Sequence, residues 1–157
     1  MRIAVAADHA GFPLKQTVID ELERLGVEVS DLGTNSTEAV DYPDFAEALG
    51  RAVQSDAVDR GVLLCGSGVG ASVAANKMPG IRAAVCHDTY SAHQGVEHDD
   101  MNVLAIGARV IGPEVAVEVV RAFVAARFSN DERHLRRLKK VLAIESRSMG
   151  EKEKSNA

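Results

Sequence analysis

The feature that most constrains this chain is a series of short apolar runs that recur between stretches with helical spacing. Residues 2–7 (RIAVAA), 61–65 (GVLLC), 82–86 (RAAVC) and 102–107 (NVLAIG) lack the polar alternation of a strand with one solvated face. Uninterrupted apolar strands are typical of parallel sheets covered by helices on both sides. With residues 27–33 as a further strand, the pattern predicts an open, five-stranded parallel α/β sheet in a Rossmann-like three-layer sandwich.

Helical patterns fill the segments between these runs. Pro13 opens the first of them and Gly26 closes it, as expected for the two ends of a helix. The expected helices cover residues 13–26, 45–54, 71–76, 89–97, 113–124 and 130–144. No linker or internal repeat divides the chain, so we expect a single domain over residues 1–147 that includes an extra C-terminal helix. Residues 148–157 are polar and are expected to form a disordered tail.

Composition and charge exclude several classes of function. The chain has 157 residues and a net charge of −5, so a general nucleic-acid binder is not expected. Aromatic residues make up 4% of the chain and Trp is absent, so a surface for stacking bases is not expected either. The longest uncharged run, residues 61–76, is too short and too rich in Gly to span a membrane. Two cysteines make no disulfide framework. We therefore expect a cytoplasmic protein with reduced thiols and no membrane or nucleic-acid partner.

Residues that can carry chemistry cluster around the ends of the expected strands. Asp8 and His9 follow the first strand, and Cys65 ends the third. His98 comes shortly before the fifth strand, and Arg109 follows it. In open parallel sheets, ligands bind beyond the carboxyl ends of the strands, near the point where the strand order reverses. We therefore expect these residues to gather at one edge of the sheet and to form a binding site there.

Three glycines, Gly66, Gly68 and Gly70, follow Cys65 and lead into a helix. Such a turn exposes backbone N–H groups that stabilise an anion, which is either a phosphate or an oxyanion formed during a reaction. The stretch GSGVGA also fits the dinucleotide-binding pattern G-x-G-x-x-G/A, and Asp88 supplies an acid about 20 residues further on. It follows the third strand rather than the first, which argues against a dinucleotide site.

Cys65 has two interpretations. It is either a small buried side chain at a strand end, or a thiol placed where the following helix favours the thiolate, so that it acts as a nucleophile or a base. Cys86 ends a strand without a glycine turn after it and is expected in the core. His98 either lies in a solvated loop or is kept in its proton-donating form by the acids that flank it. No spacing of Cys and His matches a structural zinc site, so no metal is expected.

A basic helix is expected near the C-terminus. Arg133 and Arg137 lie four positions apart in the sequence and share one face of this helix. Two guanidinium groups side by side suit a phosphate. The alternative is an ordinary solvated basic helix, which the residues alone favour.

Taken together, several stretches resemble the ribose-5-phosphate isomerase B family, which includes galactose-6-phosphate isomerase subunits. The matching stretches are DHAGFPLK (8–15), DYPDFA (41–46), CGSGVGASVAANKMPGIRAAVC (65–86), NVLAIGARVIG (102–112) and RHLRR (133–137). The resemblance covers nearly the whole chain, from about residue 2 to residue 145. It implies interconversion of the aldose and ketose forms of a sugar phosphate, without a metal or a cofactor, by a homodimer or tetramer whose sites are shared between subunits.

The resemblance also implies roles for individual residues. Cys65 corresponds to the general base that moves a proton between C1 and C2, and Ser67 would help to hold the oxygens of the cis-enediolate. His98 would assist opening of the furanose ring. Arg109, Arg133 and Arg137 would hold the phosphate. The residues expected to contact the substrate are Asp8, His9, Gly66, Gly68, Val69, Gly70, Asp99, Arg109, Arg133 and Arg137.

One position departs from the family pattern. The family has Asn after the ring-opening histidine, in HND, whereas this chain has Asp99 in HDD. An amide donates hydrogen bonds and an ionised carboxylate only accepts them, so Asp99 either is tolerated with its side chain turned away or alters substrate preference. Ribose 5-phosphate is the favoured substrate, with allose 6-phosphate, galactose 6-phosphate and a tetrulose phosphate as alternatives. A nucleotide-binding module or an inactive regulatory homologue is the alternative of another class.

Overall fold

Strands and helices alternate along the chain, as the apolar runs predict. The computed structural model describes the backbone of residues 1–155 and the side chains of residues 1–150. The strands of this part are β1 (Arg2–Ala7), β2 (Glu28–Asp31), β3 (Arg60–Cys65), β4 (Ala83–Val85) and β5 (Val103–Gly107). The helices are α1 (Phe12–Arg24), α2 (Tyr42–Gln54), α3 (Val69–Ala75), α4 (Thr89–Asp99), α5 (Pro113–Ala125) and α6 (Glu132–Ser155).

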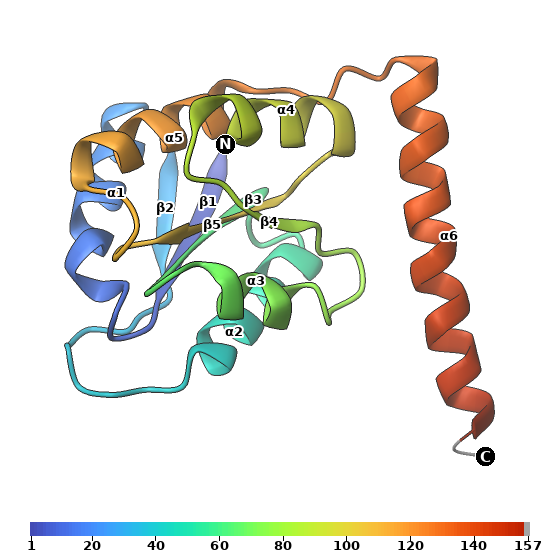
Figure 1. Cartoon of the computed structure of the whole chain (residues 1–157), viewed down its shortest axis with the longest axis horizontal. Helices are drawn as coiled ribbons and strands as arrows, with labels where there is room; N and C mark the ends of the chain where they lie inside the picture. Colours follow the sequence, from blue (N-terminus) through green and yellow to red (C-terminus); the bar gives the residue numbers. More distant parts are fainter. Residues whose placement is uncertain (156–157) are drawn as a thin grey trace.

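The strands of the described residues form one parallel sheet in the order β2-β1-β3-β5-β4 (Figure 1). This confirms the predicted five-stranded parallel α/β fold. β1 and β3 are neighbours in the middle of the sheet, and Ala7 at the end of β1 lies opposite Leu64. On the other side of β3, Cys65 lies opposite Gly107 at the end of β5. The carboxyl ends of β1, β3 and β5 therefore lie next to one another.

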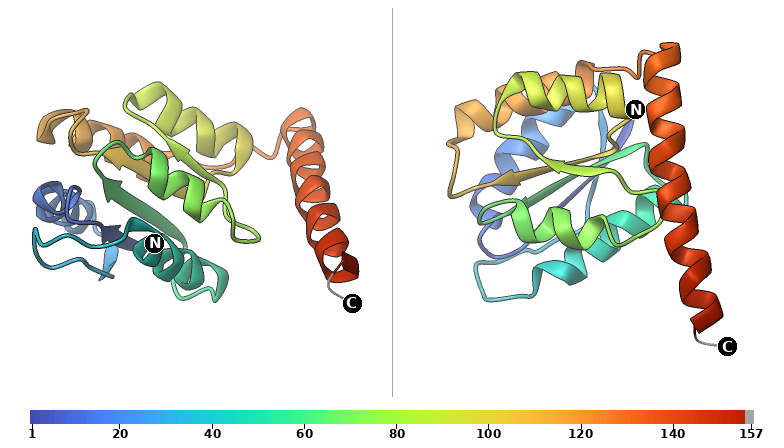
Figure 2. Two further views of the ribbon diagram at one scale, coloured as in Figure 1. Left: turned by 60° about the horizontal axis from the view of Figure 1, so that its bottom comes forward. Right: turned by 45° about the vertical axis from the view of Figure 1, so that its right-hand side comes forward.

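Successive residues of the central strands pack on opposite faces of the sheet. Val5 and Leu64 belong to a core cluster with residues of α1, α4 and α5. Leu63 and Cys65 belong to a second cluster with residues of α2 and α3. Because both faces are covered, both sets of side chains are apolar, which explains the uninterrupted runs in the sequence. The result is a sandwich with helical layers on both sides of the sheet (Figure 2).

The ends of the helices have local causes. Proline stands at the first or second position of α1, α2 and α5, where its missing N–H costs no hydrogen bond. Pro43 therefore allows α2 to begin at Tyr42, earlier than the residue 45 predicted from the sequence. Asp88 caps α4, because its Oδ1 accepts from the backbone N–H of Ser91 at 2.7 Å.

Helix α6 stands beside the sandwich rather than within one of its layers (Figures 1 and 2). Its first turn contacts α4, and further along the Glu145 carboxylate accepts from the backbone N–H of Gly80 at 3.0 Å. It is longer than the helix predicted over residues 130–144, because residues 148–155, expected to be disordered, continue it. Glu and Lys in this segment are good helix formers. Residues 156 and 157 of the expected tail lie outside the described residues.

Within the described residues, no helix combines the length and the hydropathy that a membrane span requires.

Candidate active site

The turn after β3 places a thiol under a backbone amide. The N–H of Gly68 donates to Sγ of Cys65, with nitrogen and sulfur 3.0 Å apart. Gly68 has φ of 82°, in the left-handed region, and a Cβ there would lie 3.2 Å from the carbonyl carbon of Ile106. Only glycine fits this position without strain. Cys65 is 5% exposed, and its sulfur is the acceptor in this contact.

The rest of the glycine turn is more open. Ser67 is exposed, and its Oγ accepts from the N–H of Val69 at 3.3 Å. Gly70 lies under the ring of Tyr42, because a Cβ at Gly70 would come within 2.9 Å of Tyr42 Cζ. Tyr42 was not among the predicted site residues, although it belongs to the DYPDFA stretch that resembles the family. The ring covers one side of the turn that carries Ser67.

Asp8 shapes the neighbouring loop from β1 to α1. Its carboxylate is buried, and Oδ1 accepts from the backbone N–H groups of Ala10 and Gly11 at 2.9 and 2.8 Å. A Cβ at Gly11 would lie 2.2 Å from the carbonyl oxygen of Leu64, so the loop packs directly on the end of β3. The described contacts of Asp8 are therefore those of a loop-forming residue.

His9 and Arg109 lie on either side of an open cavity. The cavity has a volume of about 370 Å³ and is lined by residues of the β1–α1 loop and the β5–α5 loop. His9 Nδ1 is 3.2 Å from both the amide nitrogen and the carbonyl oxygen of Val40, which ties it to the loop before α2. The Arg109 backbone N–H donates to the Gly66 carbonyl at 3.0 Å, and its exposed side chain extends beside Gly66. A cationic side chain therefore lies beside the turn that follows Cys65.

His98 lies at the opposite edge of the sheet, so the prediction that all these residues gather at one edge is wrong within one chain. A helix that joins parallel strands runs back from the carboxyl ends to the amino ends. α4 does this, and its last residues adjoin the start of β4, where Arg82 Nε donates to the Asp100 carbonyl at 2.6 Å. The position of His98 shortly before β5 in the sequence is consistent with this edge, because α4 ends where β5 begins.

At this second edge, His98 stacks on His134 of α6, with ring centroids 4.0 Å apart. Gln94 Nε2 lies 2.7 Å from His98 Nδ1, and Glu97 Oε2 lies 3.6 Å from His98 Nε2. His134 is 1% exposed, and its Nδ1 lies 2.7 Å from Ser129 Oγ. Burial, followed by the charges of His98 and Arg133, lowers the pKa of His134. His134 is therefore a neutral ring that packs against His98, a role that no sequence pattern predicted.

The remaining predicted site residues lie near His98. Arg133 and Arg137 belong to the first turns of α6, on either side of His134, and both are exposed. Arg133 Nη2 is 3.8 Å from the Asp131 carboxylate. An exposed ion pair at this distance contributes little to the stability of the fold. Asp99 is exposed at the last residue of α4. One edge thus carries the thiol and its glycine turn, and the other carries an imidazole and a pair of guanidinium groups.

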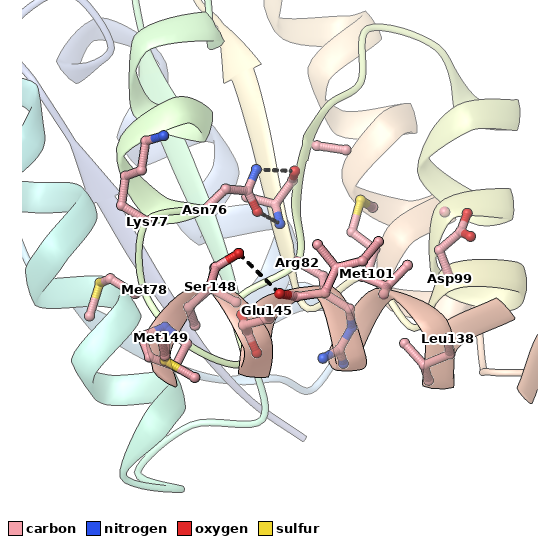
Figure 3. A pocket seen from close by; sticks show the side chains of 17 residues that line it. Asn76, Lys77, Met78, Arg82, Asp99, Met101, Leu138, Glu145, Ser148 and Met149 are labelled. Carbon is pink, nitrogen blue, oxygen red and sulfur yellow. Dashed lines mark hydrogen bonds between the residues drawn. The ribbon is translucent and has the colours of Figure 1, made fainter. Parts of the chain in front are cut away.

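Another cavity lies beside α6, away from the Cys65 turn. It has a volume of about 680 Å³ and separates α6 from the turn between α3 and β4 (Figure 3). Met78, Met101, Leu138 and Met149 give it an apolar lining, and Asp99 lies at its border. Because its walls are mostly apolar and distant from Cys65, we interpret it as a packing surface of α6 rather than as the reaction site.

Cys86 has the core position predicted for it. It is 3% exposed, and burial, together with the charge of Asp88, raises the pKa of its thiol to about 11. Neither cysteine of the chain forms a disulfide. In the part of the chain that the structure describes, no group of three metal-ligating side chains comes together. The expectation that the protein needs neither metal nor cofactor stays a prediction.

Comparison with known proteins identifies the family. The family model described as Ribose/Galactose Isomerase matches residues 3–141, so the chain belongs to this family of isomerases. Ribose-5-phosphate isomerase B of Escherichia coli (strain K12) is 47% identical over 146 residues, which cover 93% of this chain and 97% of the relative. A D-erythrulose-4-phosphate isomerase of Pectobacterium atrosepticum is 46% identical over 129 residues, covering 82% of this chain and 85% of the relative.

Solved structures agree with this assignment. The structure of Clostridium thermocellum ribose-5-phosphate isomerase B superposes with a TM-score of 0.91 at 45% identity, covering 94% of this chain and 99% of that one. The type B ribose 5-phosphate isomerase of Trypanosoma brucei gives a TM-score of 0.89 at 42% identity, covering 91% and 97%. The protein is an aldose–ketose isomerase of this type, as the resemblance predicted.

Proposed function

We propose that the protein interconverts ribose 5-phosphate and ribulose 5-phosphate through a cis-enediolate, with Cys65 as the base. The reaction moves a proton between C1 and C2 and needs a base beside a group that stabilises the oxygen gaining charge. The observation that carries the proposal is the hydrogen bond from the Gly68 N–H to Cys65 Sγ at 3.0 Å, at the carboxyl edge of the sheet. The names of several relatives, including the Escherichia coli enzyme, support the choice of pentose.

The glycine turn would hold the enediolate oxygens. Backbone N–H groups in a rigid turn stabilise an oxyanion without reorganising during the reaction. Ser67 Oγ is exposed and accepts a long, 3.3 Å bond from Val69, so a substrate oxygen can replace that contact. Gly66 would allow close approach of the sugar because it has no side chain, and Gly70 would contribute its backbone beneath the Tyr42 ring. His9 and Asp8 would form the wall of the pocket on the β1 side.

A second copy of the chain would supply the other half of the site. His98, Asp99, Arg133 and Arg137 cannot reach Cys65 within one chain, because they lie at the opposite edge of the sheet. Helix α6 stands apart from the sandwich and exposes Val141 and Ile144, at 51% and 57%, beside the apolar cavity of Figure 3. These features support a homodimer or a larger assembly in which the second edge of one copy covers the Cys65 turn of another.

In such an assembly, each group of the second edge has a chemical task. The His98 imidazole would transfer the proton that opens the furanose ring. Arg133 and Arg137, with Arg109 of the other copy, would hold the phosphate, and its binding energy would position C1 and C2 over Cys65. No cofactor takes part in this scheme. We also infer that the protein works in the cytoplasm, where its two free thiols stay reduced.

A four-carbon sugar phosphate is the second candidate substrate. The relative from Pectobacterium atrosepticum is named for D-erythrulose 4-phosphate and is about as similar to this chain as the Escherichia coli enzyme. Asp99 supports this alternative, because a carboxylate at this position can accept from a substrate hydroxyl where an amide would donate. Allose 6-phosphate and galactose 6-phosphate are further candidate substrates, to be tested in the same assay.

A coupled isomerase assay over tetrose, pentose and hexose phosphates tests the proposal. We expect the highest kcat/KM for ribose 5-phosphate, and a loss of at least about a thousandfold in kcat for Cys65→Ala. Higher kcat/KM with another sugar phosphate would overturn the choice of substrate while leaving the base in place. Full activity of Cys65→Ala would overturn the base.

A further inference from the structure

A histidine outside the predicted site binds the end of β5. His87 follows β4, and its Nε2 accepts from the backbone N–H of Gly107 at 2.9 Å. Because the amide is the donor, Nε2 carries a lone pair and the ring proton resides on Nδ1. The parallel pairing of β4 with β5 ends with Val85 opposite Ala105. Beyond it, the imidazole of His87 satisfies the Gly107 amide in place of a backbone carbonyl.

Gly107 lies directly against the turn that carries the thiol. It is the strand partner of Cys65. A Cβ at Gly107 would come within 2.6 Å of the Ser67 carbonyl carbon, and a Cβ at Gly68 within 3.3 Å of the Gly107 nitrogen. The peptide unit that His87 binds is therefore in van der Waals contact with the two residues that follow Gly66.

The residues after Gly107 hold the same turn from the other side. The Ala108 N–H donates to the Cys65 carbonyl at 2.8 Å, and the Arg109 N–H donates to the Gly66 carbonyl at 3.0 Å. The end of β5 is thus bonded to the turn through residues 108 and 109, and to His87 through residue 107. A displacement of Gly107 would therefore also displace the glycine turn after Cys65.

We propose that His87 is a positioning residue: its hydrogen bond to Gly107 fixes the peptide on which the glycine turn rests, and thereby the Gly68 N–H against Cys65. The side chain acts through Gly107 and does not touch the reacting atoms. The inference rests on the proposed role of Cys65 as the base. A displacement well below an ångström matters here, because proton transfer and oxyanion binding require aligned groups.

Two variants separate the hydrogen bond from the bulk of the side chain. His87→Leu fills similar space without an acceptor, whereas His87→Gln has a side-chain oxygen at a similar distance from Cα and restores one. His93→Leu is the matched control, because His93 is an exposed histidine on α4 whose described contact is the surface pair with Glu97. Circular dichroism and thermal melting establish that each variant is folded.

Two readouts are measured on the full chain. The first is the separation of kcat from KM for the isomerisation. The second is the rate at which iodoacetamide alkylates Cys65, with the modified peptide identified by mass spectrometry so that Cys86 is counted apart. Thiol alkylation does not depend on which sugar the protein isomerises, so it tests the positioning of Cys65 even where the proposed substrate is wrong.

We expect His87→Leu to lower kcat about tenfold or more, to change KM by less than about threefold, and to change the Cys65 alkylation rate at least about threefold. His87→Gln should bring both values back to within about threefold of the wild type, and His93→Leu should match the wild type. The proposal is overturned by a folded His87→Leu protein with wild-type kcat and alkylation. It is equally overturned by a folded His87→Gln protein as impaired as His87→Leu. If His87→Leu does not fold, His87→Ala is measured against the same two outcomes.

Discussion

The imidazole rings of His98 and His134 stack with their planes inclined by 30° and their centroids 4.0 Å apart. The contact joins the last turn of α4 to the first turn of α6. Of the side chains that the structure describes, His134 Nε2 is the buried polar atom without a hydrogen-bond partner. The stacked ring orients His98, and Arg133 and Arg137 flank His134 in α6, so the contact brings the three groups of the proposed second half-site to one place.

This stack makes stability depend on pH in a defined window. The pKa of His134 is lowered from 6.5 in the folded protein, chiefly by burial. The unfolded chain therefore binds a proton more readily, and the stability that the neutral ring contributes is present above pH 6.5 and lost as the pH falls below that value. We expect His134→Phe, which keeps a ring, to lose less unfolding free energy than the wild type between pH 7 and pH 5. Urea unfolding at several pH values measures this. If the unfolding free energies of variant and wild type fall in parallel between pH 7 and pH 5, the expectation is contradicted.

A second titration, at lower pH, concerns the contact between α1 and α5. Glu21 is buried, and its Oε1 accepts from Arg24 Nη2 and from Arg121 Nε, each at 2.6 Å. These bonds lower the pKa of Glu21 from 4.5 to about 2. The stability they contribute is present above pH 4.5 and is lost as the pH falls toward 2.

We therefore expect Glu21→Gln to destabilise the protein at pH 7 by about 1–2 kcal/mol, a modest figure because water screens the two exposed arginines. The difference between variant and wild type should shrink as the pH falls from 5 to 2. Urea unfolding at several pH values measures it. A difference that does not change with pH would contradict the assignment to the ionised carboxylate.

The paired arginines of α6 give a prediction about binding. Arg137→Ala should lower kcat/KM for the sugar phosphate about 10- to 100-fold, because a charge-assisted contact with the phosphate is lost. Lys139→Ala is the matched control, since Lys139 is also exposed on α6 but lies on the side of the helix away from Arg133 and Arg137. Steady-state kinetics measures both. Equal losses in the two variants would indicate a general effect of charge rather than a phosphate contact.

Asp99 gives a prediction about specificity. Asp99→Asn restores a hydrogen-bond donor at the end of α4, so we expect it to change the ratio of kcat/KM between ribose 5-phosphate and a four-carbon sugar phosphate by about tenfold. Both substrates are assayed with wild type and variant under one condition. An unchanged ratio would mean that the Asp99 side chain does not contact the sugar.

Much of the fold could be predicted from the residues, because apolar strands and proline-started helices are local patterns. The position of β4 beyond β5 could not, since strand order depends on packing between distant segments. The thiol and its glycine turn could be found because they are contiguous in the chain. The prediction for His98 is wrong because the edge at which it lies depends on the direction of α4 and not only on its place in the sequence. The role of His87 could not be predicted, because its partner is the backbone of Gly107, which a sequence pattern does not identify.

The central claim is that Cys65 moves the proton. The most direct measurement is kcat for the isomerisation of ribose 5-phosphate by Cys65→Ala, compared with Cys86→Ala as a second cysteine variant. The account predicts a loss of at least about a thousandfold for Cys65→Ala and a loss of less than about tenfold for Cys86→Ala, whose thiol lies in the core. A folded Cys65→Ala protein with wild-type kcat would contradict it.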